Sequence, residues 1–163
     1  HFHKIILHHI IQKRYEMYYS SRMSCILCVD IGTTSLKAGV IGDNGKVFAY
    51  SRQYFTGEKA FIANEWITAL QNASEDISIQ LVQNKNIIIN SIDSIDAICI
   101  SGNGPTLVSE NGRTILWNFD KSNISFPFET KSLFIPQLYA FKQLYRKDYN
   151  ESKYIFSGPE FVI

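Results

Sequence analysis

The first third of the chain alternates apolar and polar positions with the period of a β-strand. Residues 26–31 and 36–41 are rich in apolar side chains, and the polar segment 32–35 between them is short, which predicts a β-hairpin. The segment 43–46 is a second turn that tolerates positive φ, and residues 47–54 continue as a third strand. The pattern predicts an antiparallel meander of three strands.

A helix and a fourth strand follow the meander. Asn64 can cap a helix whose first turn contains Glu65. Apolar residues then recur at near-helical spacing, at Trp66, Ile67, Leu70, Ala73, Ile77 and Leu81. The short apolar segment 95–101 is predicted to be a strand. A right-handed crossover through the helix would place it in the sheet parallel to its neighbour. Together these elements predict an α/β fold with a mixed sheet and flanking helices.

The second half predicts shorter elements. Residues 107–117 indicate a hairpin around 110–112, and residues 153–156 a short strand. A helix with an apolar side and a basic end is expected at Ile135, Leu138, Tyr139, Phe141, Lys142 and Tyr145. Ser157, Pro159 and Glu160 form the pattern of a capping box at a helix start.

Length and charge narrow the class of partner. The chain has 163 residues and a net charge of +1, which suits one globular domain with a small-molecule partner and not a nucleic-acid-binding protein. Met23 directly precedes the first strand, so residues 1–22 are expected to be an N-terminal extension outside the fold, and 23–163 the domain. No uninterrupted apolar stretch in that extension approaches the length of a membrane span, so no membrane partner is expected.

The cysteines and histidines constrain the chemistry. The three cysteines Cys25, Cys28 and Cys99 are an odd number in a chain without a recognisable secretory leader, which predicts a reducing, cytoplasmic setting. Cys25 and Cys28 form a C-x-x-C pair, but a strand points them to opposite faces, so buried strand residues are favoured over a redox or metal role. All four histidines lie in the first nine residues, so a general base would be a carboxylate and a divalent metal would have oxygen ligands, as magnesium does.

The end of the first strand has groups suited to a phosphate. Asp30 ends a buried strand, and the Gly32-Thr33-Thr34 turn that follows offers backbone amides and two hydroxyls. The segment lacks the pattern of a phosphate loop that opens a helix, so the cradle would be the tight turn of a hairpin. The simpler alternative is a plain turn in which Asp30 only satisfies turn amides.

Residues 29–39 resemble the first phosphate motif of the actin-like ATPase superfamily, whose domains have a ribonuclease H-like fold. The resemblance implies that Asp30 helps to hold Mg²⁺ through water. It also implies that the phosphates of ATP are contacted by Gly32, Thr33, Thr34 and Lys37.

Two later segments narrow the resemblance to FGGY-family carbohydrate kinases. Residues 98–108 are similar to the strand and loop that these kinases place beside the sugar, and residues 115–120 to their Leu-Trp-Asn-Asp-like element. The implied substrate-binding residues are Asn103, Thr106 and Asp120 for sugar hydroxyls, Gly104 and Pro105 for the loop, and Trp117 for the wall. A core aromatic at Trp117 and a plain turn at residues 104–105 are the alternatives. Phe119 and Lys121 depart from the family, in which many members have an acid followed by arginine, so Asp120 can align one position away.

Residues 155–163 resemble the family segment that opens a helix after a late strand. The three resemblances imply the N-terminal, substrate-binding lobe of an enzyme that transfers the γ-phosphoryl group of ATP to a sugar or polyol. The catalytic-base aspartate is expected in a C-terminal, ATP-binding domain beyond Ile163, so the chain alone is expected to be inactive. Xylulose, gluconate, glycerol and ribulose stay open as substrates, and so does a homodimer of the full-length protein. The alternatives are an actin-like ATPase activator or structural module, and a non-catalytic truncated remnant.

Overall fold

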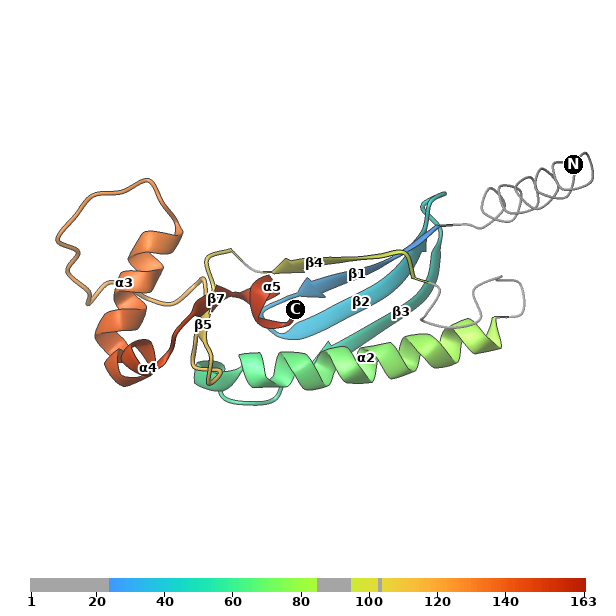
Figure 1. Cartoon of the computed structure of the whole chain (residues 1–163), viewed down its shortest axis with the longest axis horizontal. Coiled ribbons are helices and arrows are strands. Elements are labelled where there is room, and N and C mark those ends of the chain that lie inside the picture. Colours follow the sequence, from blue (N-terminus) through green and yellow to red (C-terminus); the bar gives the residue numbers. More distant parts are fainter. Residues whose placement is uncertain (1–23, 85–94, 103) are drawn as a thin grey trace, which may run out of the picture.

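The computed structural model describes residues 24–84, 95–102 and 104–163. A four-stranded sheet with the long helix α2 along it forms one part of the molecule, and a smaller group with α3 and α4 lies at one end (Figure 1). The elements in chain order are β1 (Cys25–Ile31), β2 (Ser35–Gly42), β3 (Val47–Tyr54), the 3₁₀ turn η1 (Lys59–Phe61), α2 (Ala63–Gln83), β4 (Ala97–Gly102), β5 (Leu107–Ser109), β6 (Thr114–Ile115), α3 (Phe134–Leu144), α4 (Arg146–Glu151), β7 (Ile155–Ser157) and α5 (Gly158–Phe161). The predicted extension, residues 1–22, lies outside the described residues.

The larger sheet has the strand order β3-β2-β1-β4. The first three strands pair antiparallel, and β4 pairs parallel with β1. Gly45, in the turn between β2 and β3, has a φ of 77°, which glycine adopts without the steric cost that other residues pay. The predicted meander, its parallel neighbour and the mixed α/β sheet are therefore confirmed.

The core lies between the inner face of this sheet and α2. Alternate residues of β1 are buried, because successive side chains in a strand point to opposite faces, and β2 buries Leu36, Ala38 and Val40. The buried residues of α2 are Ala63, Trp66, Ala69, Ala73, Ile77 and Leu81. The prediction was wrong at Ile67, which is 38% exposed, because a helical step of about 100° carries it away from the face that Trp66 buries.

The start of α2 also differs from the prediction. Asn64 is not the cap, because α2 begins at Ala63 and Ile62 before it already has helical dihedrals. The amide of Ala63 donates to the hydroxyl of Thr114 at 3.4 Å, so a residue distant in sequence replaces a local cap. A side chain from the β5–β6 hairpin thus joins the two parts of the molecule.

The smaller part is built on the sheet β6-β5-β7, in which both pairings are antiparallel. Its core consists of Leu107, Ile115, Ala140 and Phe141. The predicted hairpin and helix are confirmed, but Ile135 and Leu138 are exposed, because α3 buries its other side. The core of this part is therefore smaller than the sequence pattern indicates.

Helix α5 begins at the predicted capping box. The amide of Ser157 donates to the carboxylate of Glu160 at 2.9 Å, and this hydrogen bond lowers the pKa of Glu160. The ring of Phe161 packs edge-on against Trp66 of α2, with 6.4 Å between the ring centroids. The contact places α5 beside the end of the larger core.

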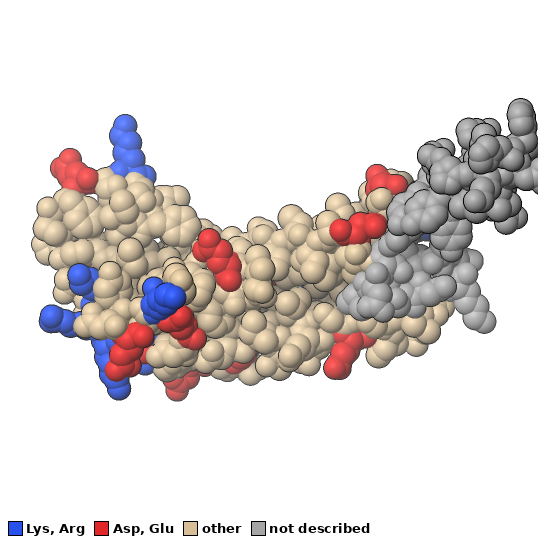
Figure 2. Space-filling model, in the orientation of Figure 1, with Lys and Arg blue, Asp and Glu red and all other residues tan. Residues whose placement is uncertain are grey.

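The part of the chain that the structure describes has no helix long and apolar enough to cross a membrane. On the face in Figure 2, the Lys and Arg side chains gather at the end with α3 and α4, where acidic side chains lie among them. Among the described residues visible there, no basic stripe runs along the molecule.

Candidate functional site

The turn between β1 and β2 is tightly closed. The amide of Gly32 donates to the carbonyl of Ser35 at 2.9 Å. A Cβ at position 32 would lie 2.8 Å from that same oxygen, a separation that real Cβ atoms essentially never show. Thr34 is exposed and Thr33 is half-buried, so both lie where a ligand can reach the turn. The sequence therefore forms a compact hairpin turn with two threonines at its tip.

Asp30 and Lys37 face each other beside this turn. They are directly paired in the β1–β2 register, and the ammonium of Lys37 donates to Asp30 Oδ2 at 2.9 Å. Their side chains are 49% and 41% exposed, and such an exposed ion pair contributes only about 0–1 kcal/mol to stability. Both groups can therefore exchange this contact for a ligand at little cost.

Asp30 offers one carboxylate to a metal ion. Among residues 24–84, 95–102 and 104–163, no group of three or more His, Cys, Asp or Glu side chains could enclose a metal. Mg²⁺ usually keeps several waters and binds through one or two carboxylates together with substrate phosphates. Asp30 supplies a single carboxylate beside the turn that is the candidate phosphate site. This fits a magnesium ion bound mainly by water and phosphate, and it does not fit a site in which protein side chains supply all the ligands.

Trp117 joins the turn to the loop that follows β4. Its indole Nε1 donates to the hydroxyl of Thr33 at 3.3 Å, and its backbone amide donates to the hydroxyl of Thr106 at 3.0 Å. The ring is 45% exposed, so the alternative of a core aromatic is wrong. The predicted phosphate turn, the predicted sugar loop and the Leu-Trp-Asn element therefore meet at one place.

The loop itself packs against Trp117. Gly104 has a φ of 41°, and a Cβ built on it would lie 3.4 Å from the Cβ of Trp117. Thr106 is buried, and Pro105 is partly buried beside it. The predicted residue Asn103 lies outside the described residues. The loop thus has a left-handed glycine where it passes Trp117.

Asp120 lies apart from these residues. Its two carboxylate oxygens accept hydrogen bonds from the amide and the hydroxyl of Ser122, at 2.9 and 3.1 Å, and these bonds lower the pKa of Asp120. Asp120 and Asn118 line a hollow of about 440 Å³ that includes neither Thr33 nor Trp117. Asp120 and Gly32 of the turn therefore line different hollows.

Two residues near Asp120 were not among the predicted ones. Lys59, from the 3₁₀ turn before α2, and Asn118 line the same hollow as Asp120. The Asn of the Leu-Trp-Asn element could have indicated Asn118, whereas no sequence signal indicates Lys59, which lies some sixty residues upstream. Lys121 instead donates to the buried Gln137 at 2.9 Å, so its ammonium contributes to the packing of α3.

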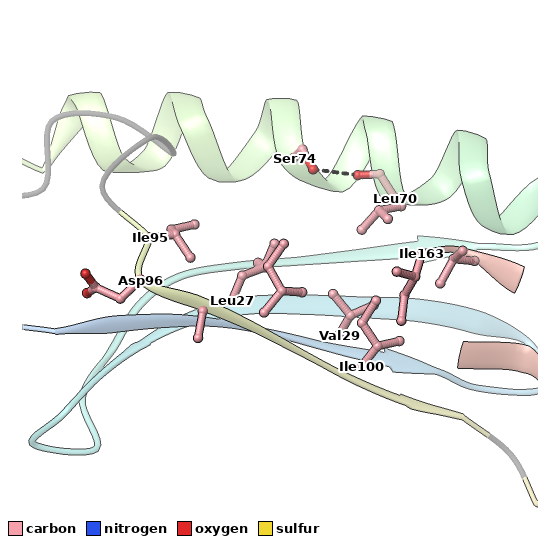
Figure 3. A pocket seen from close by; sticks show the side chains of 11 residues that line it. Leu27, Val29, Leu70, Ser74, Ile95, Asp96, Ile100 and Ile163 are labelled. Atoms are coloured by element: carbon pink, nitrogen blue, oxygen red, sulfur yellow. Dashed lines mark hydrogen bonds between the residues drawn. The ribbon is translucent and has the colours of Figure 1, made fainter. Parts of the chain in front are cut away.

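A hollow of about 720 Å³ is a groove between α2, β1 and β4 (Figure 3). Its lining is mainly apolar, with Leu27, Val29 and Ile100 pointing into it. The two polar side chains that line it are bonded to the backbone: Ser74 donates to the carbonyl of Leu70, and Asp96 accepts from the amide of Cys25, each at 2.8 Å. Convergent polar groups that would orient a sugar are not found among the described residues lining this groove.

No protein-family model matches the chain, and no curated protein matches it significantly. Solved structures share its backbone fold. The xylulose kinase from Bifidobacterium adolescentis aligns with a TM-score of 0.61 at 12% identity over 86% of this chain and 33% of that one. The gluconate kinase from Lactobacillus acidophilus aligns with a TM-score of 0.55 at 15% identity over 87% of this chain and 33% of that one. The chain has the fold of FGGY carbohydrate kinases.

A third solved structure has a similar fold. The glycerol kinase from Plasmodium falciparum, solved with ADP, aligns with a TM-score of 0.58 at 12% identity over 86% of this chain and 33% of that one. This chain thus spans about a third of the length of the kinases that it matches. The resemblance inferred from the sequence motifs is confirmed for the fold, and the roles of individual residues stay predictions.

Proposed function

We propose that this chain is the substrate-binding part of an ATP-dependent carbohydrate kinase that acts on a sugar or polyol hydroxyl in the cytoplasm. The fold that it shares with xylulose, gluconate and glycerol kinases supports this class of reaction. Because the chain spans about a third of those kinases, we expect the catalytic base and most of the adenosine contacts to come from outside it.

One observation supports the proposal most directly. The hydrogen bond from Trp117 to Thr33 joins a turn suited to phosphate with a loop suited to a sugar, although the two residues are 84 positions apart. Phosphoryl transfer depends mainly on positioning the phosphate and the acceptor hydroxyl together. We call the turn and the loop the two half-sites. A contact between them would help to position phosphate and hydroxyl for phosphoryl transfer.

On the phosphate side, the amides and hydroxyls of the turn would bind phosphate oxygens. Thr33 and Thr34 supply hydroxyls, and Gly32 allows the close backbone turn. Lys37 would exchange its contact with Asp30 for a phosphate, which leaves the carboxylate of Asp30 to bind water around Mg²⁺. The magnesium ion would supply charge neutralisation for the transferred group.

On the sugar side, the exposed ring of Trp117 would lie against the C–H face of the substrate. Gly104 and Pro105 would shape the loop beside it, and Asn103, Thr106 and Asp120 would contact hydroxyls. Each carboxylate oxygen of Asp120 accepts one hydrogen bond from Ser122, which fixes its orientation and leaves lone pairs that could accept from a substrate hydroxyl.

Titration calorimetry of the chain tests the two half-sites separately. We expect Mg²⁺–ATP to bind weakly and the variant Lys37→Ala to bind it at least tenfold more weakly, because the variant loses a charge beside the turn. Lys46→Ala, in the exposed turn between β2 and β3, is the matched control and should bind as the wild type does. Equal binding by all three proteins would contradict the phosphate-side assignment.

A panel of pentuloses, sugar acids and polyols tests the sugar side. We expect one class to raise the melting temperature of the chain, and Trp117→Ala and Asp120→Ala to abolish that rise. Stabilisation that survives both substitutions would contradict the assigned residues, and efficient phosphorylation by the chain alone would contradict the expected need for a second lobe. Binding of neither nucleotide nor sugar would favour the remnant alternative.

A further inference from the structure

Two cysteines face each other across the β1–β4 pair. Cys28 and Cys99 are Cα partners in the parallel register, and both thiols are free. Cys99 is exposed and Cys28 half-buried, and both line a shallow hollow on the face of the sheet opposite α2. Cys25, the other half of the C-x-x-C pair, is buried in the core. The fold thus pairs Cys28 with a residue 71 positions away and separates it from its neighbour in the motif.

The spacing of these thiols favours a bridging atom over a direct disulfide. Adjacent strands lie about 4.8 Å apart, and in-register side chains of a parallel pair leave the sheet side by side, so their Cβ atoms are separated by about the same distance. An unstrained disulfide needs Cβ atoms about 3.5–4.5 Å apart. Two thiolates bound to one larger atom between them tolerate a wider separation than a direct bond.

We propose that Cys28 and Cys99 form a dithiol site that binds one soft, thiophilic centre, either trivalent arsenic or a soft divalent metal ion. Thiolates are the protein ligands that such centres prefer. Tetrahedral zinc is not the occupant, because its sites have three or four protein ligands and the described residues provide no cluster of three or more candidate ligands. The carboxylate of Asp30, which lines the same hollow, is a hard oxygen ligand that suits Mg²⁺ and not a soft centre.

A centre bound at the dithiol would also affect the candidate kinase site. β1 ends at Ile31, just before the Gly-Thr-Thr turn, and β4 ends at Gly102, just before the sugar loop. A centre bound by Cys28 and Cys99 would therefore tie together the two strands that carry the two half-sites. The assignment of the dithiol itself rests on the sheet register and does not depend on the kinase proposal.

Phenylarsine oxide is a suitable probe, because its arsenic has two exchangeable positions. Two As–S bonds form as the two thiol S–H bonds and the arsenic–oxygen bonds break, and the oxygen leaves with both protons as one water molecule. No atom changes oxidation state, so no oxidant or reductant is needed. The product is a phenylarsenic group bound to both cysteines.

The test measures native binding of phenylarsine oxide to the whole chain and to single variants by intact-mass spectrometry, with excess glutathione present. We expect one phenylarsenic group on the wild type, retained in glutathione and released by a small dithiol. Cys99→Ser and Cys28→Ser should lose it about a hundredfold more readily, because a single As–S bond lacks the effective concentration of a chelate. Cys25→Ser is the matched control and should retain the group.

The control decides between the two pairs that contain Cys28. Retention by Cys99→Ser with loss by Cys25→Ser would overturn the proposal and assign the site to the C-x-x-C motif. A second measurement covers a Cys25→Ser variant that fails to fold: in the arsenical-bound wild type, native alkylation followed by peptide mapping should find Cys28 and Cys99 protected. Alkylation of Cys99 at the rate of the unbound protein would equally overturn it.

Discussion

The two parts of this molecule are held together in different ways. The part with β1 to β4 and α2 has a continuous apolar core, in which alternate strand residues meet one face of a long helix. The part with β5 to β7, α3 and α4 buries only Leu107, Ile115, Ala140 and Phe141 in its own core. Where the apolar core is small, polar side chains have to hold the backbone in place.

Gln137 and Arg113 do so in the smaller part. Gln137 is fully buried, donates to the carbonyl of Leu116 and accepts from Lys121. The guanidinium of Arg113 bonds to Asp148 at 3.1 Å and lies over the ring of Phe61, 3.9 Å from its centroid. These contacts connect α3, α4 and the β5–β6 hairpin to the turn η1 before α2, so the smaller part depends on specific partners and less on the amount of apolar surface.

The largest expected effect is in the larger core. Ile77→Ala removes a fully buried side chain between α2 and the sheet, and we expect it to lower the free energy of unfolding by about 2–5 kcal/mol. Ile79→Ala on the same helix, at a position that is 56% exposed, should change it by less than about 0.5 kcal/mol. Chemical denaturation measures both, and equal effects would contradict the assigned face of α2.

A smaller effect is expected for the polar contacts of the smaller part. Gln137→Leu leaves the carbonyl of Leu116 and the ammonium of Lys121 without this partner, at a cost of about 1–3 kcal/mol. Amide hydrogen exchange should show faster exchange in β5 and β6 and unchanged exchange in β1 and β2. The control Gln143→Leu, at an exposed position of α3, should leave both regions unchanged. Uniform acceleration in both sheets would contradict the comparison.

The ion pair of the smaller part predicts a pH dependence. The pKa of Asp148 is lowered from its ordinary value of 3.8, first by the hydrogen bond from Asn111 and then by Arg113. Because the folded state binds this proton less readily, its stabilisation is complete above pH 3.8 and is lost as the pH falls toward the lower folded-state value.

Asp148→Asn should therefore be less stable than the wild type by about 1 kcal/mol at pH 7, and the difference should shrink as the pH falls below 3.8. Thermal denaturation at several pH values measures this difference. The exposed Glu151→Gln on α4 is the control. A difference that stays constant down to the acid transition would show that Asp148 does not act through its charge.

The smallest effect is expected where the two parts meet. The pair Trp117→Phe and Thr33→Val removes the hydrogen bond between the indole and the hydroxyl, which we expect to contribute about 0.5 kcal/mol. A double-mutant cycle isolates this coupling, because each single variant removes the same contact. Additive effects would show that the two half-sites are not coupled through this bond.

The larger part could be predicted from the sequence because apolar residues recur in it at regular spacing over long segments. The bounds of β3, the turn at Gly45 and the parallel return of β4 all follow from local patterns. The start of α2 could not be predicted in this way, because its first amide is bonded to Thr114 from a hairpin distant in sequence. The sequence also did not predict which side of α3 is buried. Its buried polar residue, Gln137, is held in the interior by hydrogen bonds to distant residues and not by hydrophobicity.

For the candidate site, the sequence by itself determined which groups are available: a turn with two threonines, a glycine loop, a tryptophan and no histidine after position 9. Local rules suffice for these, because a turn or a strand is specified by the residues within it. Only the tertiary structure decided that Thr33 meets Trp117, that Asp120 lies apart, and that Cys28 pairs with Cys99 and not with Cys25. Such pairings depend on strand register and on packing between distant segments, which local sequence patterns do not specify.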